Sequence, residues 1–348
     1  MIVTTHCHII LLALVNLTAL SSALSVNWVT RHGLTGTEYQ AEHAQWAEQG
    51  LNLRCITGYT DSANGENPRY AAVWDNTTQH SQRTTHGVKK SALVTQSDAN
   101  AADDFQLKFI NMYTVGIEIL YTAIWEPGDQ TGTHLVELTG NEFENAHQSL
   151  TALGYELISM SSCNVIVEGT SQDLYSGVWA QEDPSSPANE LRFRQSANQY
   201  QAEFNNLAGQ GYRLICLAPC TFEGALHYNS IWDKPAGSSW WSSHNLEEDD
   251  YNAERENVTY QHRRTEYVSM HVMDGKPRFN AVWTDNGGLP SDCIQILNDG
   301  IINFMENNDT PGISLAIMKD GRLIFAKGYG RSDHVSGRNA AQRARPCH

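Results

Sequence analysis

The sequence predicts an α+β protein in which five tandem helix–strand–strand repeats of about 52 residues stack as one domain. Three observations predict this fold class. A short aromatic motif ending in Trp recurs five times, an amphipathic helical pattern followed by Gly precedes it, and strand-like alternation connects the two. One such unit cannot bury its own apolar face, so we expect the units to pack on each other as an open curved array or a closed ring.

The repeated motif consists of an aromatic residue, two spacers, a β-branched residue and Trp. Its five copies end at Trp74, Trp125, Trp179, Trp232 and Trp283, which are 51, 54, 53 and 51 positions apart. A residue that recurs at one place in every unit most simply packs unit against unit, so we expect these Trp side chains in the core. The alternative is an aromatic platform for sugars or extended peptides.

The fourth unit shows the predicted secondary structure most clearly. Tyr200, Phe204 and Leu207 recur at the spacing of one helix face, and Gly211 follows as a C-terminal stop. Residues 212–216 then alternate as in a strand, and the Trp motif reads as a second strand. A short strand such as 27–31 often precedes the helix. The second and fifth units are more degraded, and the fifth has His262 where the others favour Gly.

The first 25 residues predict a cleaved signal peptide, because an apolar run is followed by the small residues that surround a cleavage site. A buried N-terminal element is the alternative, since the segment lacks the usual Lys or Arg. We therefore expect a secreted, extracellular protein, with glycosylation sequons at Asn76, Asn257 and Asn308. Disulfides then become plausible, with open connectivity, among Cys55, Cys163, Cys216, Cys220, Cys293 and Cys347.

The composition excludes several classes of partner and site. The formal net charge of −16 argues against nucleic acid as a partner, and no stretch beyond the signal is apolar enough to span a membrane. No Cys/His spacing suggests zinc, and no motif suggests a cofactor or a catalytic centre within the repeats. His32 and His86 lie at equivalent positions and favour a structural role. The non-repeating Trp240 and Trp241 are the candidate ligand-binding residues.

From Ser291 the pattern changes to a helix with Ile294, Leu297, Ile301 and Phe304 on one face, followed by strands over 313–318 and 322–329. Pro311-Gly312 ends the helix, and Asp320-Gly321 predicts a hairpin turn between the two strands. Gly328-Tyr329-Gly330 closes the segment. It resembles the start of serine β-lactamase and penicillin-binding-protein-like hydrolases. Together with the preceding repeats, residues 28–331 resemble the fungal polyglycine hydrolases and their β-lactamase-related relatives, which are secreted serine hydrolases.

The resemblance implies a serine nucleophile in Ser-x-x-Lys, a Tyr-x-Asn or Ser-Asp-Asn element and a late Lys-Thr-Gly-like strand. None of these follows Ser291, so no catalytic residue is carried over. We expect a signal peptide over 1–25, the five-repeat domain over 26–290, a truncated β-lactamase-like segment over 291–331 and a disordered tail over 332–348.

The function predicted from this organisation is recognition or positioning of an extracellular protein, peptide or cell-wall glycan, without catalysis. Two alternatives stay open. The chain is an incomplete gene product of a serine hydrolase acting on glycine-rich protein, or it is a purely structural extracellular protein.

Overall fold

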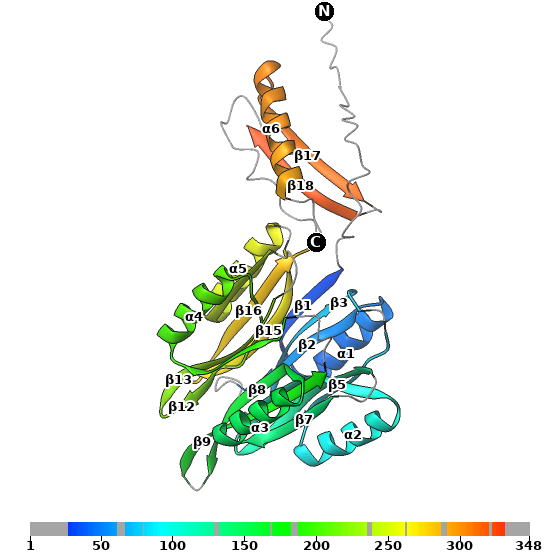
Figure 1. Cartoon of the computed structure of the whole chain (residues 1–348). Helices are drawn as coiled ribbons and strands as arrows, with labels where there is room; N and C mark the ends of the chain where they lie inside the picture. The colour runs from blue at the N-terminus through cyan, green and yellow to red at the C-terminus, as the bar shows by residue number, and fades with distance from the viewer. Residues whose placement is uncertain are drawn as a thin grey trace, which may run out of the picture. The chain divides into compact units, whose positions relative to one another are not determined.

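Each of the five repeats forms a strand, a helix and two or three further strands (Figure 1). In chain order the elements are β1 (Trp28–Leu34), α1 (Gly36–Glu48), β2 (Asn52–Tyr59) and β3 (Arg69–Asp75); β4 (Arg83–Val88), α2 (Lys90–Ala102), β5 (Phe105–Val115) and β6 (Glu118–Pro127); β7 (Thr133–Leu138), α3 (Gly140–Ala152), β8 (Tyr155–Val167) and β9 (Thr170–Gln181); β10 (Glu190–Gln195), α4 (Ala197–Gly209), β11 (Arg213–Leu217), β12 (Cys220–Phe222) and β13 (Ala225–Asp233); β14 (Trp240–Leu246), α5 (Glu248–Tyr260), β15 (Arg263–Met273) and β16 (Lys276–Asp285). The predicted α+β repeat fold is therefore confirmed, and the short leading strand is present in all five units.

This computed structural model describes residues 27–60, 67–78, 80–128, 132–167, 169–181, 187–234, 239–261, 263–286, 291–319 and 322–330. The repeats form one compact unit over Val26–Asn286, and the chain from Gly287 onward belongs to a second unit. The predicted signal peptide and the predicted disordered tail lie outside the described residues, as does His262. Among the described helices, none combines the length and apolarity needed to cross a bilayer.

The sheet in each repeat is antiparallel and has the Trp-containing strand in its middle. In the first repeat the order is β1-β3-β2, and the same order recurs in the other four, with β12 as an extra short strand on β13. The five sheets are separate, so the described strands do not form one continuous barrel. The second strand of each repeat (β2, β5, β8, β11 or β15) is an edge strand that faces its equivalents in the neighbouring repeats.

Local sequence signals begin and end the helices. Thr35 and Glu38 form a capping box at the start of α1, and equivalent capping boxes start α3 and α4. After the helices, Gly50, Gly154 and Gly211 adopt φ values of 77°, 85° and 84°, a left-handed conformation that glycine adopts at little cost. In the second repeat Asp104 takes this position with φ 62°, which explains how that repeat keeps the turn without glycine.

The aromatic residues of the repeats form the core, as predicted. The five Trp side chains are at most 2% exposed, which places them in the interior rather than on a binding platform. The fourth residue of each helix belongs to the same core and is equally buried: Tyr39, Leu93, Phe143, Tyr200 and Tyr251. Tyr251 belongs to the degraded fifth repeat, so that repeat retains the buried helical contact although its sequence has diverged.

The fifth repeat packs against the first through the same contact that joins consecutive repeats. His86 in the second repeat lies 4.8 Å from the ring of Tyr39 and 5.1 Å from that of Tyr70 in the first. His32 in the first repeat makes the equivalent edge-on contacts with Tyr251 and Phe279 of the fifth, at 5.4 and 5.1 Å. Strand β15 also contacts β2 and β3 (Figure 1). The array is therefore a closed ring, and His32 and His86 have the predicted structural role.

Burial of a histidine in the fifth repeat makes the ring sensitive to acid. His271 is 9% exposed, and burial, aided by Arg278 and His244, lowers its pKa from 6.5 to about 4. As the pH falls below 6.5 the unfolded chain binds the proton first, so stability present above pH 6.5 is lost progressively down to about pH 4. We expect this group to remove about 3 kcal/mol over that interval. Urea denaturation at pH values from 7 to 4 measures the free energy of unfolding. An equally steep loss of stability in the His271→Leu variant would show that His271 is not its cause.

The second unit contains a helix and a β-hairpin in the predicted order. These are α6 (Ser291–Asn307), β17 (Gly312–Lys319) and β18 (Arg322–Gly330), with β17 and β18 antiparallel. The hairpin is tied to the helix by Tyr329, whose hydroxyl donates to Asn298 Oδ1 at 2.7 Å. The predicted turn at Asp320-Gly321 lies outside the described residues.

Candidate functional site

A β-bulge occurs at the same place in the second strand of every repeat. The register of these strands against their neighbours shifts between Leu53 and Cys55 in β2, and at the equivalent point in β5, β8, β11 and β15. A β-bulge inserts one extra residue into a strand, and its side chain departs from the regular alternation of side chains between the two faces. The five bulge residues are Arg54, Lys108, Ile158, Ile215 and Glu266, and all five line one cavity.

This axial cavity lies where the five edge strands converge, and every repeat contributes to its wall. Its volume is about 290 Å³. Apolar side chains such as Phe109, Ile158 and Ile215 line part of it, while Glu126 and Asp233 add carboxylates from the strand ends that follow the repeated Trp. The cavity therefore combines apolar surface with several charges of both signs, as ligand-binding pockets commonly do.

Three of the residues directly after the bulges link neighbouring repeats. Cys216 Sγ donates to the Met160 carbonyl of the preceding repeat at 3.3 Å, and Tyr267 donates its hydroxyl to the Leu217 carbonyl, also at 3.3 Å. Cys55 Sγ closes the ring with a 3.8 Å contact to the Val268 carbonyl.

The plausible disulfides are not formed among the described cysteines. Cys55, Cys163, Cys216 and Cys220 are free and buried, and burial raises the pKa of the Cys55 thiol to about 12. The equivalent cysteines Cys55 and Cys216 instead serve as hydrogen-bond donors between repeats. The side chain of Cys293, and Cys347 as a whole, lie outside the described residues.

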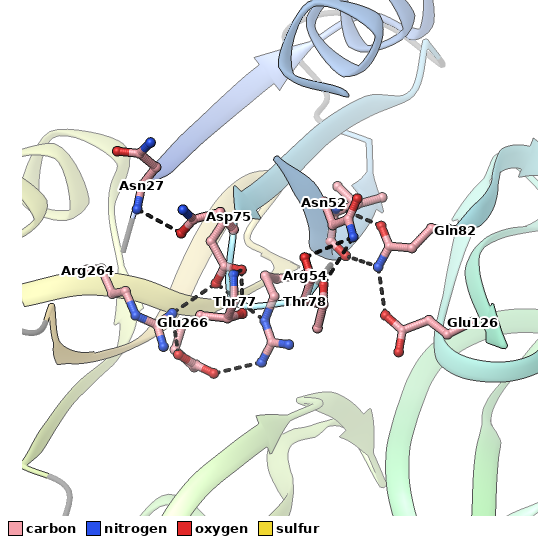
Figure 2. Close-up of polar contacts among 12 residues, drawn as sticks. Asn27, Asn52, Arg54, Asp75, Thr77, Thr78, Gln82, Glu126, Arg264 and Glu266 are labelled. Atoms are coloured by element: carbon pink, nitrogen blue, oxygen red, sulfur yellow. Dashed lines mark hydrogen bonds and ion pairs between the residues drawn. The ribbon is translucent and has the colours of Figure 1, made fainter. Parts of the chain in front are cut away.

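A cluster of four charged side chains joins the first and fifth repeats beside the cavity (Figure 2). This closure cluster consists of Arg54, Asp75, Arg264 and Glu266. Arg264 Nη1 lies 3.0 Å from Asp75 Oδ2 and 2.6 Å from Glu266 Oε2, and Arg54 Nη2 lies 2.8 Å from Glu266 Oε1. Burial alone would raise the pKa of Glu266, but Arg54, Arg264 and Arg213 together hold it below its ordinary value. The carboxylate is thus kept ionised as part of the wall.

The remaining charges of the cavity differ in how they are paired. Arg213 forms an ion pair with Asp233 at 2.6 Å within the fourth repeat. Glu126 accepts a hydrogen bond from Gln82 Nε2 at 2.7 Å and lies 3.1 Å from His80 Nε2. Lys108 has no ion pair or hydrogen bond within the described parts of the chain, although it is half-buried. The described residues also contain no group of three or more His, Cys, Asp or Glu placed to hold a metal ion.

The two candidate ligand-binding Trp residues lie on β14, away from the residues that line the cavity. Trp240 is half-buried and packs against Phe204 and Trp232, with ring centroids 5.5 and 6.0 Å apart. Trp241 is 48% exposed, and its Nε1 donates to Glu254 Oε1 at 2.9 Å. Adjacent residues of a strand face opposite sides, so the two rings do not form one platform. Trp241 has the more exposed ring of the two candidates.

The three sequon asparagines have different surroundings. Asn257 is exposed on α5, and Asn308 is exposed just after α6. Asn76 is half-buried, and its Oδ1 accepts a hydrogen bond from the Asn27 amide at 3.0 Å.

Sequence reasoning did not identify the cavity residues, although two signals for them were present. The residue directly before the bulge, such as Leu214, is Leu in most units. The bulge residue that follows it varies among Arg, Lys, Ile and Glu. In addition, three of the five repeated Trp residues are followed directly by a carboxylate, at Asp75, Glu126 and Asp233. Where residues differ at one position of an otherwise regular repeat, packing between the repeats does not determine the side chain at that position.

The fold and this cavity define the molecule as a closed ring of tandem repeats with a mixed-charge axial cavity. The chain belongs to the polyglycine hydrolase-like family. The model of the polyglycine hydrolase-like structural repeat matches residues 25–77, 80–128, 135–182, 186–235 and 237–286, which is well over half of the chain. These matches confirm the suspected family and the tandem repeats, and they end before α6. A comparison with curated proteins gave no match.

Proposed function

We propose that the ring is a secreted recognition and positioning module for an extracellular protein, peptide or glycan, and that it does not itself catalyse a reaction. The supporting observation is the asymmetry of the bulge residues in an otherwise regular ring. The buried aromatic positions are nearly alike in all repeats, whereas the five bulge residues comprise two cations, one carboxylate and two isoleucines around one cavity. Packing alone would not require such variety, but recognition of an asymmetric ligand would.

Blocking the cavity tests this role. The purified full chain is titrated against immobilised peptides and cell-wall oligosaccharides, and we expect saturable binding to one of them. Ile215→Arg, which places a long cation into the cavity, should weaken that binding by about tenfold or more. The matched control is Leu153→Arg, because Leu153 is 69% exposed. Equal binding by both variants would place recognition elsewhere on the ring, and absence of binding to every member of the panel would contradict the recognition role.

A serine hydrolase is the second candidate function, because α6, β17 and β18 have the order that the resemblance to β-lactamase-like enzymes implies. Treatment of the secreted chain with a fluorophosphonate or penicillin-type label distinguishes the two. The recognition role predicts no covalent mass increase on the intact protein. A stoichiometric adduct would mean that one serine is an activated nucleophile.

We also propose N-glycans at Asn76, Asn257 and Asn308. The exposure of Asn257 and Asn308 supports access by the glycosylation machinery, whereas the half-buried Asn76 is held by its bond to the Asn27 amide. The mass of the secreted chain before and after enzymatic deglycosylation tests the assignment.

A further inference from the structure

The charges of the axial cavity are not all balanced by permanent charges of the protein. Arg54 and Glu266 neutralise each other within the closure cluster, and Arg213 pairs with Asp233. Two lining charges of opposite sign are left without a Lys, Arg, Asp or Glu partner within ion-pair distance among the described residues. These are Lys108 and Glu126.

Lys108 is directed to the cavity by the bulge in β5 rather than by chance exposure. Its equivalents in other repeats are either apolar, as in Ile158 and Ile215, or engaged in ion pairs, as in Arg54 and Glu266. A half-buried ammonium group surrounded partly by apolar side chains is stabilised by an anion at this place. A carboxylate on a ligand would satisfy it.

Glu126 supplies the complementary group from the neighbouring strand of the same repeat. It lies near the end of β6, and its side chain is 19% exposed. In Figure 2 the Glu126 side chain accepts a hydrogen bond from Gln82 and lies apart from the closure cluster around Glu266. Gln82 Nε2 donates to Oε1 at 2.7 Å, and His80 Nε2 lies 3.1 Å from Oε2. Each carboxylate oxygen has two lone pairs, so the group retains acceptor capacity for a ligand ammonium group.

The size and the apolar wall limit the ligand. About 290 Å³ is room for about ten water molecules, at the lower end of small-molecule pockets. Phe109, Ile158 and Ile215 offer an apolar surface in the same cavity as Lys108 and Glu126. A ligand that meets all three features has a carboxylate, an ammonium group and a small apolar group.

We propose that the axial cavity binds the zwitterionic form of an amino acid or very short peptide with an apolar side chain. The Lys108 ammonium pairs with the ligand carboxylate, the Glu126 carboxylate accepts from the ligand ammonium, and Phe109, Ile158 and Ile215 contact the apolar group. This proposal rests on the proposed recognition function and specifies its ligand.

Calorimetric titration of the full chain with four probes tests it: leucine, Gly-Leu, N-acetyl-Gly-Leu and Gly-Leu amide. We expect leucine or Gly-Leu to bind, and the stronger of the two identifies a free amino acid or a peptide as the source. Capping either terminus of Gly-Leu removes one charge and should weaken binding by about tenfold or more, as expected for loss of a hydrogen bond to a charged group.

Variants assign each charge to its partner. Lys108→Gln should bind Gly-Leu about tenfold more weakly and no longer distinguish it from Gly-Leu amide, whereas Glu126→Gln should no longer distinguish it from N-acetyl-Gly-Leu. Lys276→Gln, at an exposed lysine that begins β16, is the matched control and should bind like the natural chain. Thermal denaturation of each variant confirms that the ring is folded.

Three outcomes would overturn the zwitterion site. They are equal binding of capped and uncapped peptides, unchanged selectivity in Lys108→Gln, and no binding of any of the four probes. If the probes fail but a member of the peptide and oligosaccharide panel binds and Ile215→Arg weakens it, the recognition function stands and only the ligand assignment is wrong.

Discussion

Replacing Asp75 by Ala should lower the free energy of unfolding by about 3–5 kcal/mol, the range typical for breaking a buried ion pair. The Asp75 side chain is fully buried, and its carboxylate accepts from the Thr77 amide and hydroxyl at 2.9 and 2.5 Å. Its other oxygen pairs with Arg264, whose side chain is only 10% exposed. The substitution leaves the buried guanidinium group of Arg264 and the half-buried one of Arg54 facing the single carboxylate of Glu266. Urea denaturation at pH 7 measures the loss.

Because Asp75 and Arg264 are 189 residues apart in the chain, this result also tests ring closure. In an open array the pair would not exist, and the cost would be confined to the local bonds with Thr77 and the 3.5 Å ion pair with Arg54 of the same repeat. Asp103→Ala is the matched control, since Asp103 pairs with Arg83 at 2.8 Å but is 60% exposed. Exposed pairs contribute at most about 1 kcal/mol, so a similar loss in both variants would contradict the closed ring.

Trp179→Ala should cost about 3–5 kcal/mol, because the side chain is fully buried and truncation leaves a large cavity. The ring packs against Phe143 with centroids 5.6 Å apart, and Nε1 donates to His147 Nδ1 at 3.4 Å. Each repeat contacts its neighbours, so the loss should appear in one cooperative transition of the ring rather than in a separate step. Chemical denaturation followed by both fluorescence and far-UV circular dichroism checks this.

Trp241→Ala provides the same change of side chain at the surface. Trp241 is 48% exposed, so its removal should cost about 1 kcal/mol or less. Comparable losses in the two variants would show that Trp179 does not have the core role that its repetition indicates. Trp241→Ala should also leave binding of Gly-Leu unchanged, because Trp241 does not line the axial cavity.

Local patterns were enough to predict the repeat unit. The Tyr200, Phe204 and Leu207 spacing gave the helix, Gly211 gave its end, and the recurrence of Trp gave the core, because each depends on residues within a few positions of one another. The same logic assigned His32 and His86 a structural role from their equivalent positions. The contact between the candidate residue Trp240 and Phe204 could not be predicted, because a non-repeating Trp can lie on the surface or against the core.

Repetition along the chain was enough to predict the repeat unit, the number of units and the family. The three-dimensional arrangement was needed to show that the array closes and that Arg54 contacts Glu266. It was also needed to show that Lys108 and Glu126 line one cavity with residues of all five repeats. The physical reason is that closure depends on small rotations between repeats, which accumulate over the whole ring and leave no local pattern. The same holds for the bulge residues. They are far apart in the sequence and line one cavity only because the five strands converge in the folded ring.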